Sequence, residues 1–377
     1  MVFLYHVIAC DVPIQSGGWL YALGVSTFQL WCGVDLFFVL SGFFILSTLL
    51  SNEGRPHSAR NYFISRFFRI VPLYVFLLLG YFYLPRFIGH NRLTGMMFDT
   101  TTPNFVYLVL GQAWSAYFTH DNGAGFIGVT WSLSVEVFLY VVAAAVVYGC
   151  KGDRIRILAA LALSSWAIRA VASVVFHSYL ICYFLPVCRM DEFMLGGIVA
   201  VMLRKGHLNG IGPKAIMRLR IFVCACIALF AGTTLALTDS KGEFAAVVDF
   251  AFLGVFFSAA LILVLAGGRN AGNAAEGGAG RGGMISRAIV SPLSYLGLIS
   301  YSVYIFHIPI HYLFNYFCGL DDISLIYPGA WGRLFAECLV TLLFCSLTYR
   351  LIEEPMIRVG RRFTRDQAAP LPRGLPG

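Results

Sequence analysis

The feature that most constrains this chain is a series of apolar stretches, each close to the length that crosses a lipid bilayer. A transmembrane helix needs about 20 mostly apolar residues to span a hydrocarbon core of about 30 Å. Apolar residues make up 59% of the chain and charged residues only 12%, which excludes an ordinary soluble domain. We therefore predict an all-α, polytopic membrane helix bundle. Nine stretches meet the length criterion, near residues 30–50, 70–90, 127–149, 157–176, 180–203, 221–237, 245–266, 289–317 and 331–352.

The chain opens with a further apolar stretch, residues 1–10, that is too short to cross a membrane alone. At 1.5 Å per residue it reaches about 15 Å, or half of the hydrocarbon core. It has neither the basic start nor the small-residue cleavage site of a signal peptide. We expect it to be the second half of a first helix that is truncated at its N-terminus, which makes about ten transmembrane helices.

The distribution of basic residues predicts how the chain is oriented. If ten helices alternate and both ends lie inside, about 21 of the 27 Lys and Arg residues fall on the inner side and about three in the opposite loops. An excess of this kind is typical of the cytoplasmic face. We therefore predict that both termini are cytoplasmic. The net charge of +8 then reflects contact with anionic membrane lipids, and no nucleic-acid partner is expected.

The domain organisation follows from the lack of long polar segments between the apolar stretches. We predict one membrane domain over residues 1–358, so any chemistry must take place within the helical bundle. Residues 359–377 end in a segment rich in Pro and Gly and are expected to form a disordered cytoplasmic tail.

One carboxylate, Asp35, lies within the apolar run of residues 33–42. Burying it in hydrocarbon costs at least about 2.5 kcal/mol, so it should face the bundle interior, a partner or a watery cavity. In the same run, Ser41 and Gly42 allow another helix or a ligand to approach closely. Asp35 is therefore a candidate site residue, and the competing interpretation is a capping or snorkelling Asp at the outer membrane edge.

Two histidines lie in apolar segments far apart in the sequence, His6 and His307. A histidine titrates near neutral pH and suits a general base or a proton relay, although a helix-pairing or interfacial role is the competing interpretation. Tyr304 and His307 share a helix face at i and i+3, and Pro309 is expected to kink this helix. No carboxylate or thiol stands beside His307, so we expect no metal.

Arg66 and Arg69 lie at i and i+3 in the inner connection after the second span, on one helix face. Guanidinium groups bind phosphate oxygens bidentately, so this pair can hold a phosphate-rich cofactor that enters from the cytosol. The alternative is that both residues only anchor the protein at the cytoplasmic surface.

Ser132 and Glu136 lie at i and i+4 at the start of an apolar helix, so their hydroxyl and carboxylate share one face. Trp131, next to them, fits the aromatic belt at a membrane interface. The alternative for Glu136 is a structural ion pair with an arginine such as Arg189 or Arg333.

Further charges fall inside predicted spans, and we expect them to neutralise one another in a buried network. This group consists of Arg169, Arg189, Asp191 and Glu192. At the end of the last span, Pro355 is expected to stop the helix. Glu353 or Glu354 is expected to pair with Arg350 there.

The order of these motifs resembles the acyltransferase-3 family of membrane O-acyltransferases. The family's arginine that precedes the first-helix histidine has no counterpart, because the chain begins only a few residues before His6. The segments that carry the resemblance cover nearly the whole chain, and they are residues 3–6, 33–42, 66–70, 131–136, 299–307 and 350–355.

The resemblance implies an enzyme of the bacterial inner membrane that takes an acyl group, commonly acetyl, from cytosolic acyl-CoA. The acceptor would be a hydroxyl of an extracytoplasmic or lipid-linked carbohydrate, such as an exopolysaccharide. Acetyl-CoA is then a cosubstrate, a polysaccharide or lipid-linked saccharide is the partner, and no metal is required. The alternatives are a proton-coupled secondary transporter or flippase, and an inactive truncated relative.

The resemblance also assigns roles to residues. His6 is expected to be the general base, oriented by Asp35, with Glu136 as a third catalytic residue; an acyl-His6 intermediate is the open alternative to direct transfer. Arg66 and Arg69 correspond to the family's Arg-x-x-Arg motif and are expected to bind the CoA phosphates. The other expected donor-binding residues are Phe37, Phe38, Ser41 and Gly42, and the expected acceptor-binding residues are Trp131, Ser132, Tyr304 and His307.

Overall fold

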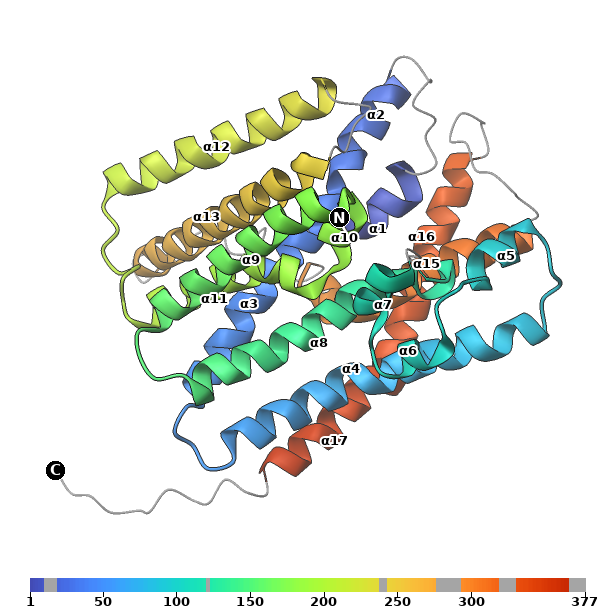
Figure 1. Cartoon of the computed structure of the whole chain (residues 1–377), viewed down its shortest axis with the longest axis horizontal. Helices are drawn as coiled ribbons and strands as arrows, with labels where there is room; N and C mark the ends of the chain where they lie inside the picture. Colours follow the sequence, from blue (N-terminus) through green and yellow to red (C-terminus); the bar gives the residue numbers. More distant parts are fainter. Residues whose placement is uncertain (10–18, 120–122, 237–242, 276–292, 319–329, 366–377) are drawn as a thin grey trace.

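The computed structural model describes residues 1–9, 19–119, 123–236, 243–275, 293–318 and 330–365. These residues form helices and connections, and no β-strand occurs among them. The long helices lie side by side in one bundle, with α12 at its periphery and α3 in its interior (Figure 1). The predicted all-α architecture is confirmed.

Six helical stretches within the described ranges are long and apolar enough to cross a membrane. Each overlaps one of the predicted spans, so the polytopic membrane character is also confirmed. They are Ser26–Ser51, Ser58–Arg86, Gly125–Gly149, Arg154–Phe176, Val247–Gly267 and Trp331–Thr364.

The described parts of the other three predicted spans are mostly helical, and residues 237 and 289–292 of these spans lie outside the described residues. The stretch predicted at 180–203 is divided into α10 (Tyr179–Phe184) and α11 (Met190–Arg204), because Pro186 begins a 3-10 turn between them. The helix α12 (Pro213–Ala236) begins earlier than expected, in a basic segment. The helix α15 (Ser300–Cys318) contains several polar side chains in its apolar sequence.

The first residues are helical, as α1 (Val2–Leu4) followed by a π-helical turn over Tyr5–Ala9. Short helices between α4 and α8 cover one end of the bundle (Figure 1). The remaining helices are α2 (Trp19–Phe28), α3 (Gly33–Ser51), α4 (Ser58–Tyr83), α5 (Arg92–Phe98), α6 (Asn104–Leu108), α7 (Gln112–Thr119), α8 (Trp131–Ala144), α9 (Arg154–Phe176), α13 (Glu243–Ala275), α16 (Ala330–Thr348) and α17 (Glu354–Arg365).

The helices α3 and α11 cross at two glycines, which let the backbones touch. A Cβ atom at Gly42 would overlap the carbonyl group of Phe193, and one at Gly196 would overlap that of Val39. Small residues at a crossing are a common device for close packing of membrane helices. This contact fixes α3 and its polar residues against α11.

Substitution Gly42→Ala is expected to lower the free energy of unfolding by about 1–3 kcal/mol, because the added methyl group must push two backbones apart. Gly267→Ala is the matched control, since a Cβ atom there meets no atom within 4 Å. Its expected effect is neutral or stabilising, by up to about 1 kcal/mol, from helix propensity. Thermal unfolding in detergent measures both variants, and equal midpoints for Gly42→Ala and wild type would contradict the account.

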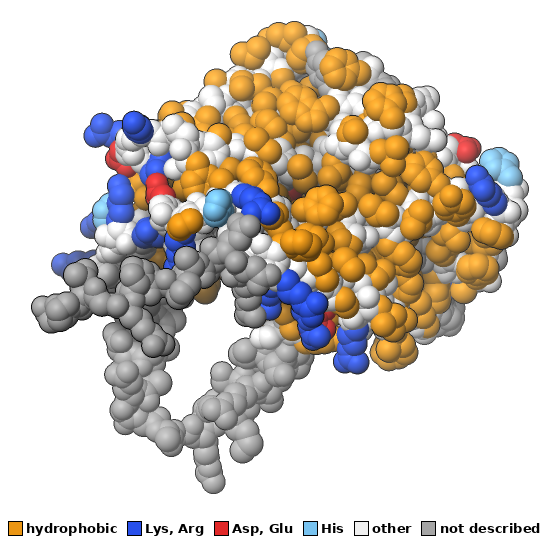
Figure 2. Space-filling view, turned by 90° about the horizontal axis from the view of Figure 1, so that it is seen from below, with side chains coloured by type: hydrophobic (Ala, Val, Ile, Leu, Met, Phe, Trp, Pro, Cys, Tyr) orange, Lys and Arg blue, Asp and Glu red, His pale blue; other side chains and the backbone are white. Residues whose placement is uncertain are grey.

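The two ends of the bundle differ in charge. The connections at residues 52–57, 150–153 and 205–212 lie at the left end of the bundle in Figure 1. Lys and Arg side chains gather at the same end in Figure 2, while hydrophobic side chains cover most of the remaining visible face. The protein thus has an apolar belt and a basic end, as the charge pattern predicts.

The last helical segment is longer than predicted. A π-helical turn over Tyr349–Glu353 leads directly into α17, which runs beside α4 (Figure 1). Pro355 is the second residue of α17, and the helix continues past it from the π-helical turn, so the prediction that it ends the helix is wrong. Of the segment predicted to be disordered, residues 359–365 are helical, and residues 366–377 lie outside the described residues.

The carboxylates near Pro355 also have other partners than predicted. Glu354 forms an ion pair with Arg358, 2.6 Å away, because the continued helix places them at i and i+4. The side chain of Ser302 donates a hydrogen bond to Glu353 over 2.8 Å, which ties α15 to this turn. Among the described residues, Arg350 pairs with neither carboxylate.

Candidate active site

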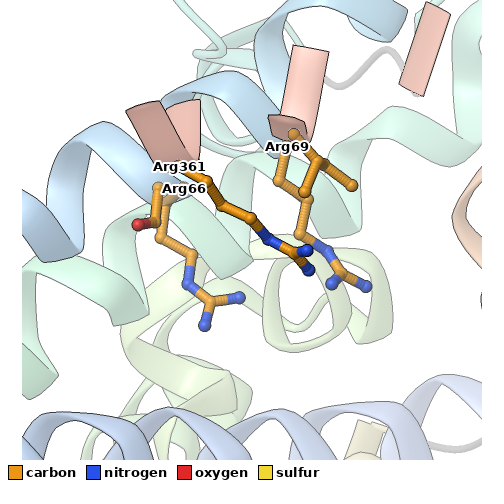
Figure 3. Close-up of a pocket in the computed structure, with 5 residues that line it drawn as sticks. Arg66, Arg69 and Arg361 are labelled. Carbon is orange, nitrogen blue, oxygen red and sulfur yellow. The ribbon is translucent and has the colours of Figure 1, made fainter. Parts of the chain in front are cut away.

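Arg66 and Arg69 lie together at an open pocket, as their spacing predicts. The pocket encloses about 140 Å³ and is lined by α4 and α17. Arg361 of α17 extends its guanidinium group into the same space as those of Arg66 and Arg69 (Figure 3). Ser65 and Ile357 complete the lining. The arrangement offers three cationic groups to one ligand.

Arg66 reaches from the pocket toward the bundle interior. Its guanidinium carbon lies 5.5 Å from the ring centre of Tyr140 and 5.8 Å from that of Tyr62, which are cation–π distances. Its Nε atom is buried and has no hydrogen-bond partner among the described residues. A ligand oxygen can satisfy such a donor.

Glu136 lies in the interior next to this arginine site. Its carboxylate accepts a hydrogen bond from Ser41 over 3.0 Å and a short one from Tyr140. Only 7% of Glu136 is exposed, so the two hydroxyl groups replace the water that it would otherwise bind. The alternative of an ion pair with Arg189 is wrong, because Arg189 binds other carboxylates.

The polar residues of α8 form one continuous face. Ser132, Glu136 and Tyr140 follow one another at i, i+4 and i+8, which places them above one another on successive turns. Eight residues of helix extend about 12 Å. This face begins at the Arg66 guanidinium group and leads to the polar residues of α15.

At the far end of this face, Ser132 meets Tyr304. Their hydroxyl groups are in short hydrogen-bond contact, and the two oxygen atoms lie 3.1 and 3.0 Å from the carbonyl oxygen of Val129. Because each hydroxyl group has one proton, one donates to the other, which in turn donates to that carbonyl oxygen. The Phe37 ring stacks on the Tyr304 ring at 6.3 Å between centres and is 41% exposed.

His6 and His307 form a pair one turn from Tyr304. Nδ1 of His6 lies 3.1 Å from Nε2 of His307, and their ring centres are 5.1 Å apart. The first turn of the chain thus packs directly against α15. The sequence places these residues 301 positions apart and gives no sign of their contact.

The hydrogen-bond partners of the two rings indicate which ring nitrogen atoms carry a proton. Nδ1 of His307 lies 2.7 Å from the carbonyl oxygen of Tyr304, so it carries a proton and donates it, which leaves Nε2 as an acceptor. Nδ1 of His6 lies between that acceptor and the carbonyl oxygen of Val2, 3.0 Å away, so it must be a donor. Nε2 of His6 is then unprotonated, which is the state a general base requires.

Asp35 does not lie beside His6. It is fully buried and binds Arg189, 2.8 Å away, because its face of α3 points toward α11. Arg189 also lies 3.3 Å from Glu192, and Arg169 lies 2.6 Å from Asp191. The predicted buried charge network is confirmed, whereas the predicted orientation of His6 by Asp35 is wrong; His307 occupies that position.

Several other predicted site residues lie away from the pocket that they were assigned to. Trp131 packs against Tyr183 and Phe184 in the core and is 8% exposed, so it does not form part of an exposed aromatic belt. Phe38 is fully buried beside Arg189. Gly42 is covered by α11. These residues support the site, and none of them lines the arginine pocket.

Two residues of the site are not among those predicted from the sequence. Tyr140 continues the i, i+4 series of Ser132 and Glu136, so the spacing alone could have identified it. Arg361 falls in the segment that was assigned to a disordered tail. The strong amphipathicity of residues 354–365 was the available signal for a surface helix there.

The helical bundle and its site fit a membrane-embedded transferase, and comparison with known families agrees. Residues 1–350 match the acyltransferase-3 family, described as an acyltransferase domain. Because the match covers most of the chain, this protein belongs to that family and is a membrane acyltransferase. Neither the curated proteins nor the solved structures give a match.

Proposed function

We propose that this protein is a membrane O-acyltransferase that moves an acyl group, most simply acetyl, from cytosolic acyl-CoA to a hydroxyl of a carbohydrate. The acceptor would be an extracytoplasmic or lipid-linked saccharide such as an exopolysaccharide. The observation that carries the proposal is the polar face of α8. It joins a pocket of arginines at one end to a pair of histidines at the other.

The length of the path along this polar face, from the arginine pocket to the histidine pair, suits acyl-CoA. The phosphate groups would bind Arg66 and Arg69, as bidentate partners of guanidinium groups. The pantetheine arm is about 15–20 Å long when extended. It can therefore follow the roughly 12 Å from Tyr140 to Ser132 and bring the thioester to His6. Ser41 and Phe37 would contact the arm from α3.

The proposed reaction uses His6 as the base. Nε2 of His6 takes the proton of the acceptor hydroxyl as its oxygen attacks the thioester carbonyl carbon. The C–S bond then breaks, and the proton passes to the leaving CoA thiolate. Ser132 and Tyr304 would contact the acceptor beside this base. Because the thioester supplies the energy of transfer, this chemistry requires neither a metal nor ATP.

The charge distribution supports a cytoplasmic position for the arginine pocket. The pocket is built from α17 and the beginning of α4, which belong to the basic side of the chain in the predicted topology. Basic ends of membrane proteins face the cytoplasm and its anionic lipids. We therefore propose a bacterial inner-membrane location with both termini inside and the acceptor entering from the outer side.

The test is transfer of labelled acetyl groups from acetyl-CoA to surface glycan by membranes that contain the protein. The double substitution Arg66→Gln and Arg69→Gln is expected to raise the KM for acetyl-CoA at least about tenfold, because two charge-assisted phosphate contacts are lost. Arg86→Gln, an exposed arginine beyond the other end of α4, is the control and should match the wild type. An unchanged KM in the double variant would contradict the donor site.

A further inference from the structure

The third guanidinium group of the pocket comes from outside the part of the chain that matches the family. The match ends at residue 350, whereas Arg361 lies on α17. Figure 3 shows its side chain crossing the pocket toward those of Arg66 and Arg69. Arg361 is therefore a site residue that the family motif does not contain.

The helix α17 is held firmly enough to position this side chain. Gly360 is buried against Phe68 of α4, where a Cβ atom would come within 2.8 Å of the Phe68 side chain. The ring of Phe363 stacks on the ring of Phe68, with 5.6 Å between centres. These contacts flank Arg361 on both sides and fix α17 against α4.

The three arginines of the pocket form no direct ion pair within the part of the chain that the structure describes. Among the described residues, no carboxylate lies at ion-pair distance from Arg66, Arg69 or Arg361. The neighbouring Arg358 does have such a partner, Glu354. Like charges that share one pocket repel one another unless an anion binds between them.

We propose that Arg361 is a third phosphate-binding residue and that α17 forms the outer wall of the acyl-CoA site. The inference rests on the proposed function and extends its donor site to a second helix. Arg66 and Arg69 come from one helix face and can contact a phosphate group from one side only. Arg361 approaches from the opposite helix, so the three residues together enclose the phosphates of CoA.

A phosphate group at this membrane surface could also belong to an anionic lipid. The experiment therefore uses the full chain in nanodiscs of phosphatidylcholine, with CoA as the probe. Arg361→Gln is expected to weaken CoA binding about tenfold through the loss of one charge-assisted contact. Arg362→Gln is the matched control, because this neighbour on α17 does not line the pocket and should bind CoA like the wild type.

A donor without phosphates separates lost binding from damaged structure. S-acetyl-pantetheine cannot use the arginine pocket, so Arg361→Gln and the wild type should consume it at equal rates. If wild type binds CoA and Arg361→Gln binds it equally well, the inference is wrong and the proposed function stands. If phosphatidylglycerol binding falls in Arg361→Gln while CoA binding does not, the pocket belongs to a lipid. If the wild type binds no CoA, the proposed function itself fails.

Discussion

Substitution His6→Gln is expected to lower acyl transfer by about 10²- to 10⁴-fold, the usual contribution of a positioned general base. The reason lies in the tautomer that the structure assigns. His307 and the carbonyl oxygen of Val2 both accept from Nδ1 of His6, so Nε2 is left free to take a proton. Glutamine cannot supply a comparable base, although it is similar in size.

The measurement is the transfer rate at saturating acetyl-CoA, together with CoA binding. Binding should change by less than about twofold, because the phosphate contacts lie at the other end of the path. His207→Gln is the control, an exposed histidine in the connection between α11 and α12. Transfer at the wild-type rate in His6→Gln would show that another group removes the proton.

Substitution Arg189→Leu is expected to destabilise the protein by about 3–5 kcal/mol, because it leaves buried carboxylates without their cation. Arg189 is fully buried and lies within ion-pair distance of Asp35 and Glu192. Its guanidinium carbon also lies 3.9 Å from the ring centre of Phe250. The residue thus links α3, α11 and α13 in the centre of the bundle.

Thermal unfolding in detergent tests this expectation against an exposed ion pair. Arg358→Leu breaks the contact with Glu354 at the surface, where such pairs contribute about 0–1 kcal/mol. Adding Asp35→Leu to Arg189→Leu should restore part of the lost stability, since one unpaired carboxylate is removed. If Arg189→Leu and Arg358→Leu unfold at the same temperature, the buried network does not stabilise the fold.

The features that depend on local spacing could be predicted from the sequence. Apolar stretches of spanning length became helices, because a chain in lipid must satisfy its backbone hydrogen bonds within each segment. Arg66 and Arg69 share a face because i and i+3 are neighbours on any helix. Ser132 and Glu136 share a face for the same kind of reason.

The features that depend on which helices meet could not be predicted in this way. The prediction that Asp35 faces the bundle interior is confirmed, but the prediction that it orients His6 is wrong, because burial of a charge requires a partner but does not identify it. Arg189 and His6 are both plausible partners in sequence, and only the packing of α3 on α11 selects Arg189. The pairing of His6 with His307 likewise arises from a contact between segments 301 positions apart in the sequence.

Pro355 shows how a correct local principle can give the wrong boundary. A proline disrupts the interior of a helix, yet it is well accommodated in a first turn. Here the helix continues through the π-helical turn into α17, with Pro355 as the second residue of α17. Because the helix was expected to end there, Arg361 was placed outside the site.

The central claim is that one polar path carries acyl-CoA from the arginine pocket to the histidine pair. The most direct measurement is the structure of the protein in a lipid nanodisc with a non-hydrolysable thioether analogue of acetyl-CoA bound. We expect the phosphates within about 3 Å of the guanidinium groups of Arg66, Arg69 and Arg361. We also expect the acyl carbonyl beside His6. Phosphates bound away from this pocket, or an acyl group that ends in lipid, would contradict the account.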